Sequence, residues 1–177
     1  AIMANVEHKV SLISGIHDLL PNRTGGAIMQ KNLEILGDIQ YTQDEIDFAL
    51  DMQKANGKPQ IGIDGKIRPL RETLESPGGG STDVGDVSYN VPVVSLAATT
   101  APKGVPWHSW SVVASSGMSI GHKGMLHAAK ALGMSMIDIY KDKKLREEIK
   151  KEFDERIGDY NYDPYLNPGP PPIDYVD

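Results

Sequence analysis

Residues 93–133 read VVSLAATTAPKGVPWHSWSVVASSGMSIGHKGMLHAAKALG and join a short apolar run to a proline-rich loop and a helical pattern. The run over 93–98 predicts a short strand buried on both faces, because its side chains are mostly apolar. Over 117–132 an apolar stripe recurs at helical spacing; its members are Met118, His122, Met125, Ala129 and Leu132. Gly133 is expected to end that helix, ahead of a separate short turn or helix over 136–140.

Two helices are predicted before this unit. Thr24 is expected to cap the first, and Gly37 to end it. Thr42 followed by Glu45 has the spacing of a capping box, which predicts that a second helix begins there and covers roughly 43–55. The region therefore reads as helix-rich.

The rest of the chain contains one more strand pattern and several irregular segments. Residues 5–13 alternate apolar and polar side chains, which predicts a half-buried strand without an evident partner. Residues 58–80 read as loop, 83–90 as a short helix and 142–156 as an amphipathic surface helix. Residues 158–177 are rich in proline and tyrosine, so they either wrap the surface through their rings or are disordered.

Composition excludes several classes of function. The chain of 177 residues is long enough for one domain, and its net charge of -6 argues against a nucleic-acid partner. It has no cysteine, so a metal would have to be bound by His, Asp or Glu. No apolar run approaches the roughly 20 residues that span a bilayer, and the first residues lack a signal pattern. We therefore expect a soluble, cytoplasmic protein with no membrane partner.

The glycine-rich segment 78–83, GGGSTD, is the first candidate site. Glycines allow close backbone approach, and amides and hydroxyls before a helix suit a carboxylate or phosphate. A plain surface loop that ends in a helix cap is an equally simple interpretation. A Walker phosphate loop is excluded, because no Gly-Lys-Ser/Thr follows.

His108 is the second candidate, because it lies in a proline-flanked loop after the predicted strand. Open α/β sheets bind ligands at the carboxyl ends of strands. His122 and His127 are five residues apart, which does not match a helical two-His zinc motif. We interpret His122 as a core or pocket-wall residue and assign no role to His8 or His17.

The set of candidate ligands is too small for a complete catalytic site. A catalytic metal needs about three protein ligands, whereas the sequence offers one well-placed histidine. No Gly-x-Ser-x-Gly elbow supports a serine hydrolase either. Either the chain is not an enzyme, or part of its site lies outside it.

Four segments together resemble one known family. They read SGIHDLLPNRTGGAIMQKNLEILG, YTQDEIDFALDMQKANG, GGGSTDVGDVSYNVPVVSLAATT and GVPWHSWSVVASSGMSIGHKGMLHAAKALG. They are similar to the carboxyl-terminal part of the p-aminobenzoyl-glutamate hydrolase B-subunit group, within the aminoacylase and carboxypeptidase superfamily of metal-dependent amidohydrolases (zinc peptidases). The resemblance extends from about Ser14 to Tyr140, and the GGGSTDVGDVS and HSW blocks are specific to the group.

This resemblance implies a fold and a domain division. The family has an α/β catalytic domain, with helices on a mixed β-sheet, interrupted by a lid domain that dimerises. Residues 1–20 would then hold the last strand of the lid and a linker. Residues 21–157 would form the carboxyl-terminal part of the catalytic domain, and 158–177 a tail. The chain would be a fragment of a longer protein that forms a homodimer or hetero-oligomer.

The resemblance also implies site residues. His108 falls on the last histidine ligand of a two-metal centre, occupied by zinc or manganese. The substrate carboxylate would be held by Gly79, Gly80, Ser81, Thr82 and Asp83. Many relatives have Glu-Asp-Phe where this chain has Thr82-Asp83-Val84, so the contacts of the loop are expected to differ.

The implied reaction is hydrolysis of an amide bond by a metal-activated water. The substrate would be an N-acyl amino acid similar to p-aminobenzoyl-glutamate, or a dipeptide. No catalytic residue is expected in this chain, because the general-base Glu belongs to the missing half, so the chain alone should be inactive. The alternatives are a non-catalytic anion-binding or assembly module of a split protein, and a degenerate relative that only binds.

Overall fold

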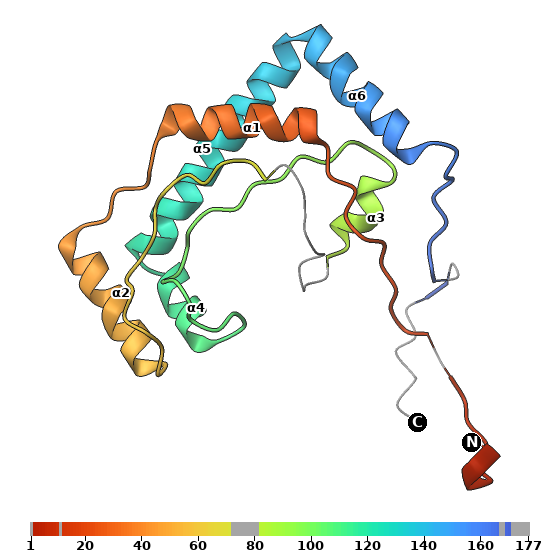
Figure 1. Ribbon diagram of the computed structural model, residues 1–177, viewed down its shortest axis with the longest axis horizontal. Helices are drawn as coiled ribbons and strands as arrows, with labels where there is room; N and C mark the ends of the chain where they lie inside the picture. Colours follow the sequence, from red (N-terminus) through yellow and green to blue (C-terminus); the bar gives the residue numbers. More distant parts are fainter. Residues whose placement is uncertain (1, 11, 72–81, 167–168, 171–177) are drawn as a thin grey trace.

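The structure of the chain is a computed structural model, which describes residues 2–10, 12–71, 82–166 and 169–170. Its helices are η1 (Ile2–Ala4), α1 (Arg23–Leu36), α2 (Gln43–Ala55), α3 (Val84–Ser88), α4 (Trp110–Ser116), α5 (Ser119–Lys141) and α6 (Lys143–Ile157). Figure 1 shows an arch in which α1 crosses α5 and packs on it, α2 and α4 form one limb, and α3 lies on the other. Helix α6 packs against both α1 and α5.

The N-cap of helix α1 lies two residues before the predicted cap. Asn22 is the N-cap, and its Oδ1 accepts a hydrogen bond from the amide of Gly25 at 2.8 Å. Its Nδ2 also donates to the carbonyl of Ile149 on α6, at 2.9 Å. The prediction that Thr24 caps this helix is therefore wrong, because a buried contact with α6 selects Asn22. The predicted end at Gly37 is confirmed.

The capping box at the start of α2 is confirmed. Oγ1 of Thr42 accepts from the amide of Glu45, and Oε2 of Glu45 accepts from the amide of Thr42 at 2.7 Å. Ser111 on α4 then donates from Oγ to Oδ1 of Asn56, the C-cap of α2, at 2.9 Å. This hydrogen bond joins the two helices of one limb.

Helix α5 continues through Gly133, so the predicted end there is wrong and residues 136–140 belong to the same helix. Ala131 and Ser135 are buried on either side of this glycine. Asn32 on α1 donates from Nδ2 to Oγ of Ser135 at 3.0 Å. Packing against α1 thus outweighs the roughly 1 kcal/mol that a helical glycine costs. Neither this helix of 23 residues nor any other in the described part of the chain is long and apolar enough to cross a membrane.

Two further helices match their predicted positions, whereas α4 and η1 were not predicted. Helix α3 lies within the range 83–90, and α6 covers the charged run 142–156. Leu145 and Ile149 form the buried side of α6, and its exposed face has ion pairs four residues apart, such as Lys150 with Asp154. This is the amphipathic surface helix that the sequence predicts.

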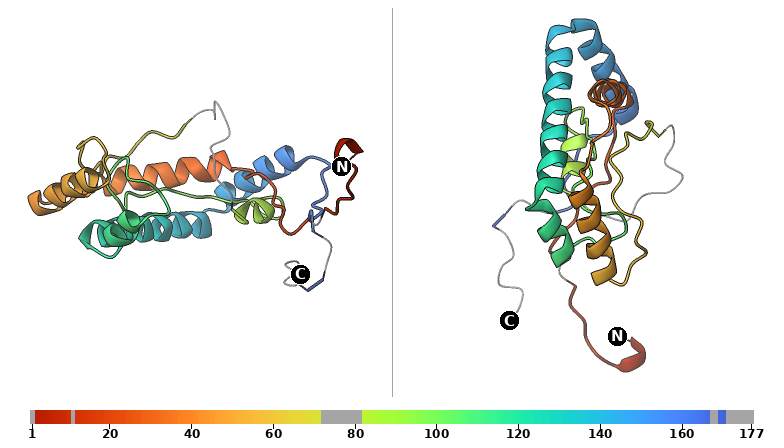
Figure 2. Two further views of the ribbon diagram at one scale, coloured as in Figure 1. Left: turned by 90° about the horizontal axis from the view of Figure 1, so that it is seen from below. Right: turned by 90° about the vertical axis from the view of Figure 1, so that its left-hand side faces the viewer.

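The strands that the sequence predicts are not formed within the described residues. Residues 6–10 and 12–14 are exposed and project away from the helices (Figures 1 and 2). Residues 93–98 are extended, and their one β-bridge is parallel, between Val93 and Pro21. A strand needs a partner for its hydrogen bonds. The α/β fold and the three-part division at residues 20 and 157 therefore stay predictions.

Candidate functional site

His108 has an unusual backbone conformation. Its φ of 58° lies in the left-handed region, which residues other than glycine seldom adopt. The next residue, Ser109, is the N-cap of α4, and its Oγ donates to the carbonyl of Pro106 at 2.6 Å. The imidazole is exposed between the exposed rings of Trp107 and Trp110. Such strained positions are concentrated at ligand sites, so the conformation is consistent with a functional His108.

The described residues by themselves do not form a metal centre. Among them there is no group of three His, Asp or Glu side chains that could bind one ion together. His8 is exposed, and His127 is partly exposed. His122 is exposed too, so the interpretation of His122 as a core residue is wrong. Nε2 of His127 is buried without a hydrogen-bond partner among the described atoms. His108 could therefore contribute one ligand to a centre, with the others coming from outside this part of the chain.

The predicted carboxylate site is described only in part. Gly79, Gly80 and Ser81 lie outside the described residues. Thr82 and Asp83 are exposed, and Asp83 occupies the N-cap position of α3 without a side-chain capping hydrogen bond. Oγ1 of Thr82 instead accepts from the amide of Val84 at 3.3 Å. The start of α3 thus leaves the Asp83 carboxylate exposed to solvent.

The two predicted parts of the site lie apart. Figures 1 and 2 place α3 on one limb of the arch and α4, which follows His108, on the other. A cavity of about 860 Å³ lies under α1, but neither Asp83 nor His108 lines it. The structure therefore does not bring the carboxylate site and the expected metal ligand together.

An aromatic cluster around His17 was missed by the sequence reasoning. His17 is only 6% exposed. Its Nδ1 lies 2.7 Å from Oδ1 of Asp86 on α3, and its Nε2 lies 2.7 Å from the hydroxyl of Tyr160. The rings of Tyr162 and Tyr165 also pack on the imidazole. The repeated tyrosines of the tail were the available signal, and for these three the wrapping alternative is confirmed.

The electrostatics of this cluster are dominated by two aspartates. The hydrogen bond from His17 lowers the pKa of Asp86, despite the opposing effect of burial. Burial and the nearby Asp86 carboxylate raise the pKa of Tyr162. On the C-cap of α3, the hydrogen bond from Tyr89 to Asp18 raises the pKa of Tyr89 to about 12. Both tyrosines are thus neutral at neutral pH, and Tyr162 lies beside the ionised carboxylate of Asp86.

A second ionic cluster joins α2 and α5. Lys123 donates from Nζ to Oε2 of Glu45 at 2.6 Å, and the same Nζ lies 5.6 Å from the ring centre of Tyr41. Burial would raise the pKa of Glu45, but the hydrogen bonds from Lys123 and Thr42 lower it to about 2. Burial and the Glu45 carboxylate raise the pKa of Tyr41 to about 12. The capping box that the sequence predicts is therefore also an interhelical contact.

Comparison with known proteins supports a relationship to one hydrolase. The chain is 32% identical over 157 residues to the B-subunit of p-aminobenzoyl-glutamate hydrolase from Escherichia coli (strain K12). The match covers 75% of this chain, and the chain spans 33% of the length of that relative. No protein-family model matches the chain, and no solved structure matches it significantly. The similarity confirms the resemblance that the sequence motifs indicate.

Proposed function

We propose that this chain, a relative of the p-aminobenzoyl-glutamate hydrolase B-subunit, is part of a metal-dependent amidohydrolase. Its substrate would be an N-acyl amino acid similar to p-aminobenzoyl-glutamate, or a dipeptide. The observation that supports this most directly is the identity of 32% over 157 residues to one chain of a hydrolase. Because the chain spans 33% of that relative, the remaining ligands and the general-base Glu would come from outside it.

His108 would provide one metal ligand. Three features support this role: the left-handed backbone, the exposed imidazole and the short loop that ends at the N-cap of α4. Zinc or manganese would supply the charge that polarises an amide carbonyl and a water molecule. Within the described residues, no group of three His, Asp or Glu side chains completes a centre around His108. The chain alone is therefore expected to be inactive.

Thr82 and Asp83, together with Gly79, Gly80 and Ser81, would face the substrate carboxylate. The exposed Thr82 and Asp83 at the start of α3 support this assignment. The carboxylate of Asp83 would repel a substrate carboxylate directly, so we assign the attraction to the Thr82 hydroxyl and to backbone amides.

The α/β fold would be completed by the part of the protein outside this chain. Val93, Val94, Leu96 and Ala98 are half-buried, although the sequence predicts a strand buried on both faces. Within the described residues, the segment 93–98 makes one backbone–backbone hydrogen bond. The carbonyl of Val93 accepts it from the amide of Asn22, at 3.3 Å. Unpaired backbone groups beside apolar side chains favour pairing with further strands. We propose that this segment becomes a strand of a mixed sheet in the longer protein.

The test uses the complete open reading frame that encodes the chain. Wild type and His108→Ala are purified, and metal content and turnover of p-aminobenzoyl-glutamate and dipeptides are measured. We expect His108→Ala to lose bound metal and at least a hundredfold in kcat/KM. His8→Ala, an exposed histidine in the N-terminal segment, is the matched control and should resemble wild type.

Two outcomes would contradict this proposal. Equal metal content in wild type and His108→Ala would remove His108 from the ligand set. Turnover by the 177-residue chain alone, with added zinc or manganese, would show that the chain is not an incomplete part of the enzyme.

The charge of the cavity under α1 favours a second candidate, a non-catalytic anion-binding module. Among the residues that the structure describes, its charged lining comprises Arg23, Lys66, Arg68, Arg71, Lys103 and one acid, Asp64. Calorimetric titration of the 177-residue chain with p-aminobenzoyl-glutamate, without metal, separates the two candidates. Binding that weakens at least tenfold in Lys103→Gln, together with absent turnover in the longer protein, would favour the binding module.

A further inference from the structure

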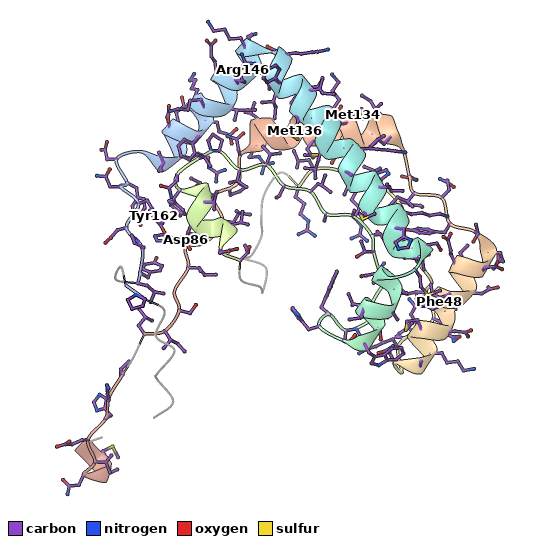
Figure 3. All side chains as sticks on the ribbon, turned by 180° about the vertical axis from the view of Figure 1, so that it is seen from behind. Phe48, Asp86, Met134, Met136, Arg146 and Tyr162 are labelled. Carbon is purple, nitrogen blue, oxygen red and sulfur yellow. The ribbon has the colours of Figure 1, made fainter. Side chains whose placement is uncertain are left out.

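His17 links two segments that are distant in sequence. On one side, its Nδ1 lies 2.7 Å from Oδ1 of Asp86, in the middle of α3. On the other side, its Nε2 lies 2.7 Å from the hydroxyl of Tyr160, which follows α6. Because a carboxylate only accepts hydrogen bonds, Nδ1 carries a hydrogen toward Asp86. Figure 3 shows Asp86 and Tyr162 near each other, where α3 meets the C-terminal segment.

Tyrosine rings enclose the imidazole. The ring of Tyr165 stacks on that of His17 with centres 4.3 Å apart and planes at 4°. The rings of Tyr162 and Tyr89 lie 5.2 Å and 5.1 Å from it. We call Tyr160, Tyr162 and Tyr165 the tyrosine clamp. Aromatic contacts of this kind add to the burial of apolar surface, so the clamp holds His17 in one orientation.

The backbone on both sides of His17 is also packed closely. A Cβ on Gly85 of α3 would collide with the carbonyl oxygen of His17, and one on Gly15 would lie 2.8 Å from Cβ of Tyr165. The amide of Leu20 donates to Oγ of Ser88 on α3, at 2.8 Å. The segment 15–20 therefore lies between α3 and the tyrosine clamp, with His17 as its buried residue.

Helix α3 depends on these contacts. It has five residues, well below the length at which an isolated helix is stable in water. Its buried residues are Gly85 and Ser88, which contact the segment 15–20. We therefore expect a change in the contacts of His17 to disturb α3, and with it Thr82 and Asp83, which precede the helix.

We propose that the tyrosine clamp, acting through His17 and Asp86, positions the start of α3 for binding of the substrate carboxylate. This inference rests on the proposed function, because that function assigns Thr82 and Asp83 to the carboxylate. Tyr160 and Tyr165 are positioning residues and not catalytic ones. The C-terminal segment would then affect substrate affinity without touching the substrate.

Paired substitutions in the complete open reading frame test the clamp. Tyr165→Ala removes the stacked ring, whereas Tyr165→Phe keeps it; Tyr160→Phe removes only the hydroxyl that contacts Nε2. Tyr140→Ala on α5 is a control, because its side chain is 84% exposed. The first measurement is hydrogen exchange at the amides of Leu20, Asn90 and Val91, which are hydrogen-bonded at α3 or its C-terminal end.

We expect Tyr165→Ala and Tyr160→Phe to accelerate exchange at these amides at least tenfold. Tyr165→Phe and Tyr140→Ala should leave it unchanged. Unchanged exchange in Tyr165→Ala would overturn the clamp. The result does not depend on turnover, so it stands even if the protein proves not to be a hydrolase.

The second measurement determines KM and kcat separately for each variant, to show which of the two the substitution changes. For an N-acyl amino acid, Tyr165→Ala is expected to raise KM about tenfold with kcat within twofold of wild type, and Tyr165→Phe to restore KM. An analogue in which a primary amide replaces the free carboxylate should show no such change. Faster exchange at α3 with an unchanged KM would overturn the link to substrate binding. Absence of turnover in wild type would instead contradict the proposed function.

Discussion

Lys123 on α5 donates a hydrogen bond from Nζ to Oε2 of Glu45 on α2, at 2.6 Å. The same carboxylate oxygen completes the capping box of α2. Both side chains are shielded from solvent, with 34% of Lys123 and 7% of Glu45 exposed. Glu45, which caps the start of α2, therefore also connects α2 to α5 through Lys123.

Glu45→Gln is expected to destabilise the protein by about 2 kcal/mol at pH 7, because it weakens charge-assisted hydrogen bonds to Lys123 and to the Thr42 amide. The pKa of Glu45 is lowered from 4.5 to about 2. Its contribution to stability is therefore complete above about pH 4.5 and is lost as the pH falls through about 2. Urea unfolding at several pH values measures this. Glu155→Gln, which alters an exposed ion pair, should change stability by less than about 0.5 kcal/mol.

Gln53→Leu is expected to cost about 3 kcal/mol, because the side chain is 0% exposed and satisfies buried backbone groups. Its Nε2 donates to the carbonyls of Gly62 and Lys103, and its Oε1 accepts from the amides of Ile61 and Gly62. Chemical unfolding gives the difference. Gln43→Leu, at an exposed position on α2, should cost far less; a similar cost for both would show that burial does not explain the effect.

Two glycines of α5 should respond to alanine in opposite directions. A Cβ on Gly124 would collide with the carbonyl oxygen of Thr99, whereas one on Gly133 would meet nothing within 4 Å. Gly124→Ala is expected to destabilise by about 2 kcal/mol or more through overpacking. Gly133→Ala is expected to stabilise by about 1 kcal/mol through helix propensity. Thermal unfolding of both variants is the measurement, and a stabilised Gly124→Ala would contradict the close packing of α5 on residue 99.

His108→Gly should be more stable than His108→Ala by about 1 kcal/mol, because only glycine adopts a left-handed backbone without strain. The backbone φ of 58° is the basis for this expectation. Urea unfolding of the two variants measures the difference. Equal stability would mean that the loop does not keep the left-handed conformation.

Most of the helices could be predicted from local signals. These signals depend on residues three or four positions apart. They are the capping box of Thr42 and Glu45, the end of α1 at Gly37 and the apolar side of α6. The start of α1 and the end of α5 could not be predicted in this way. Asn22 becomes the N-cap of α1 because its side chain also donates to a carbonyl on α6. Helix α5 continues through Gly133 because the residues around this glycine pack on α1.

The site was predicted less completely than the helices. The GGGSTD and HSW blocks identified Asp83 and His108 as candidates, and the relationship to one chain of a hydrolase is confirmed. The cluster around His17 was missed, because its members come from residue 17, α3 and the segment after α6. The spacing of residues within any one of these segments does not predict that the three segments come into contact.

The sequence by itself determined the positions of α2, α3 and α6, and to which hydrolase the chain is related, because both depend on short-range patterns and on motif identity. Only the tertiary structure decided that Asp86 contacts Nδ1 of His17 and that Tyr160 contacts Nε2 of the same ring. It also decided that Glu45 belongs to an interhelical ion pair and that His108 has a left-handed backbone. The reason is physical: these contacts join residues far apart in the chain, and their geometry arises only when the helices pack.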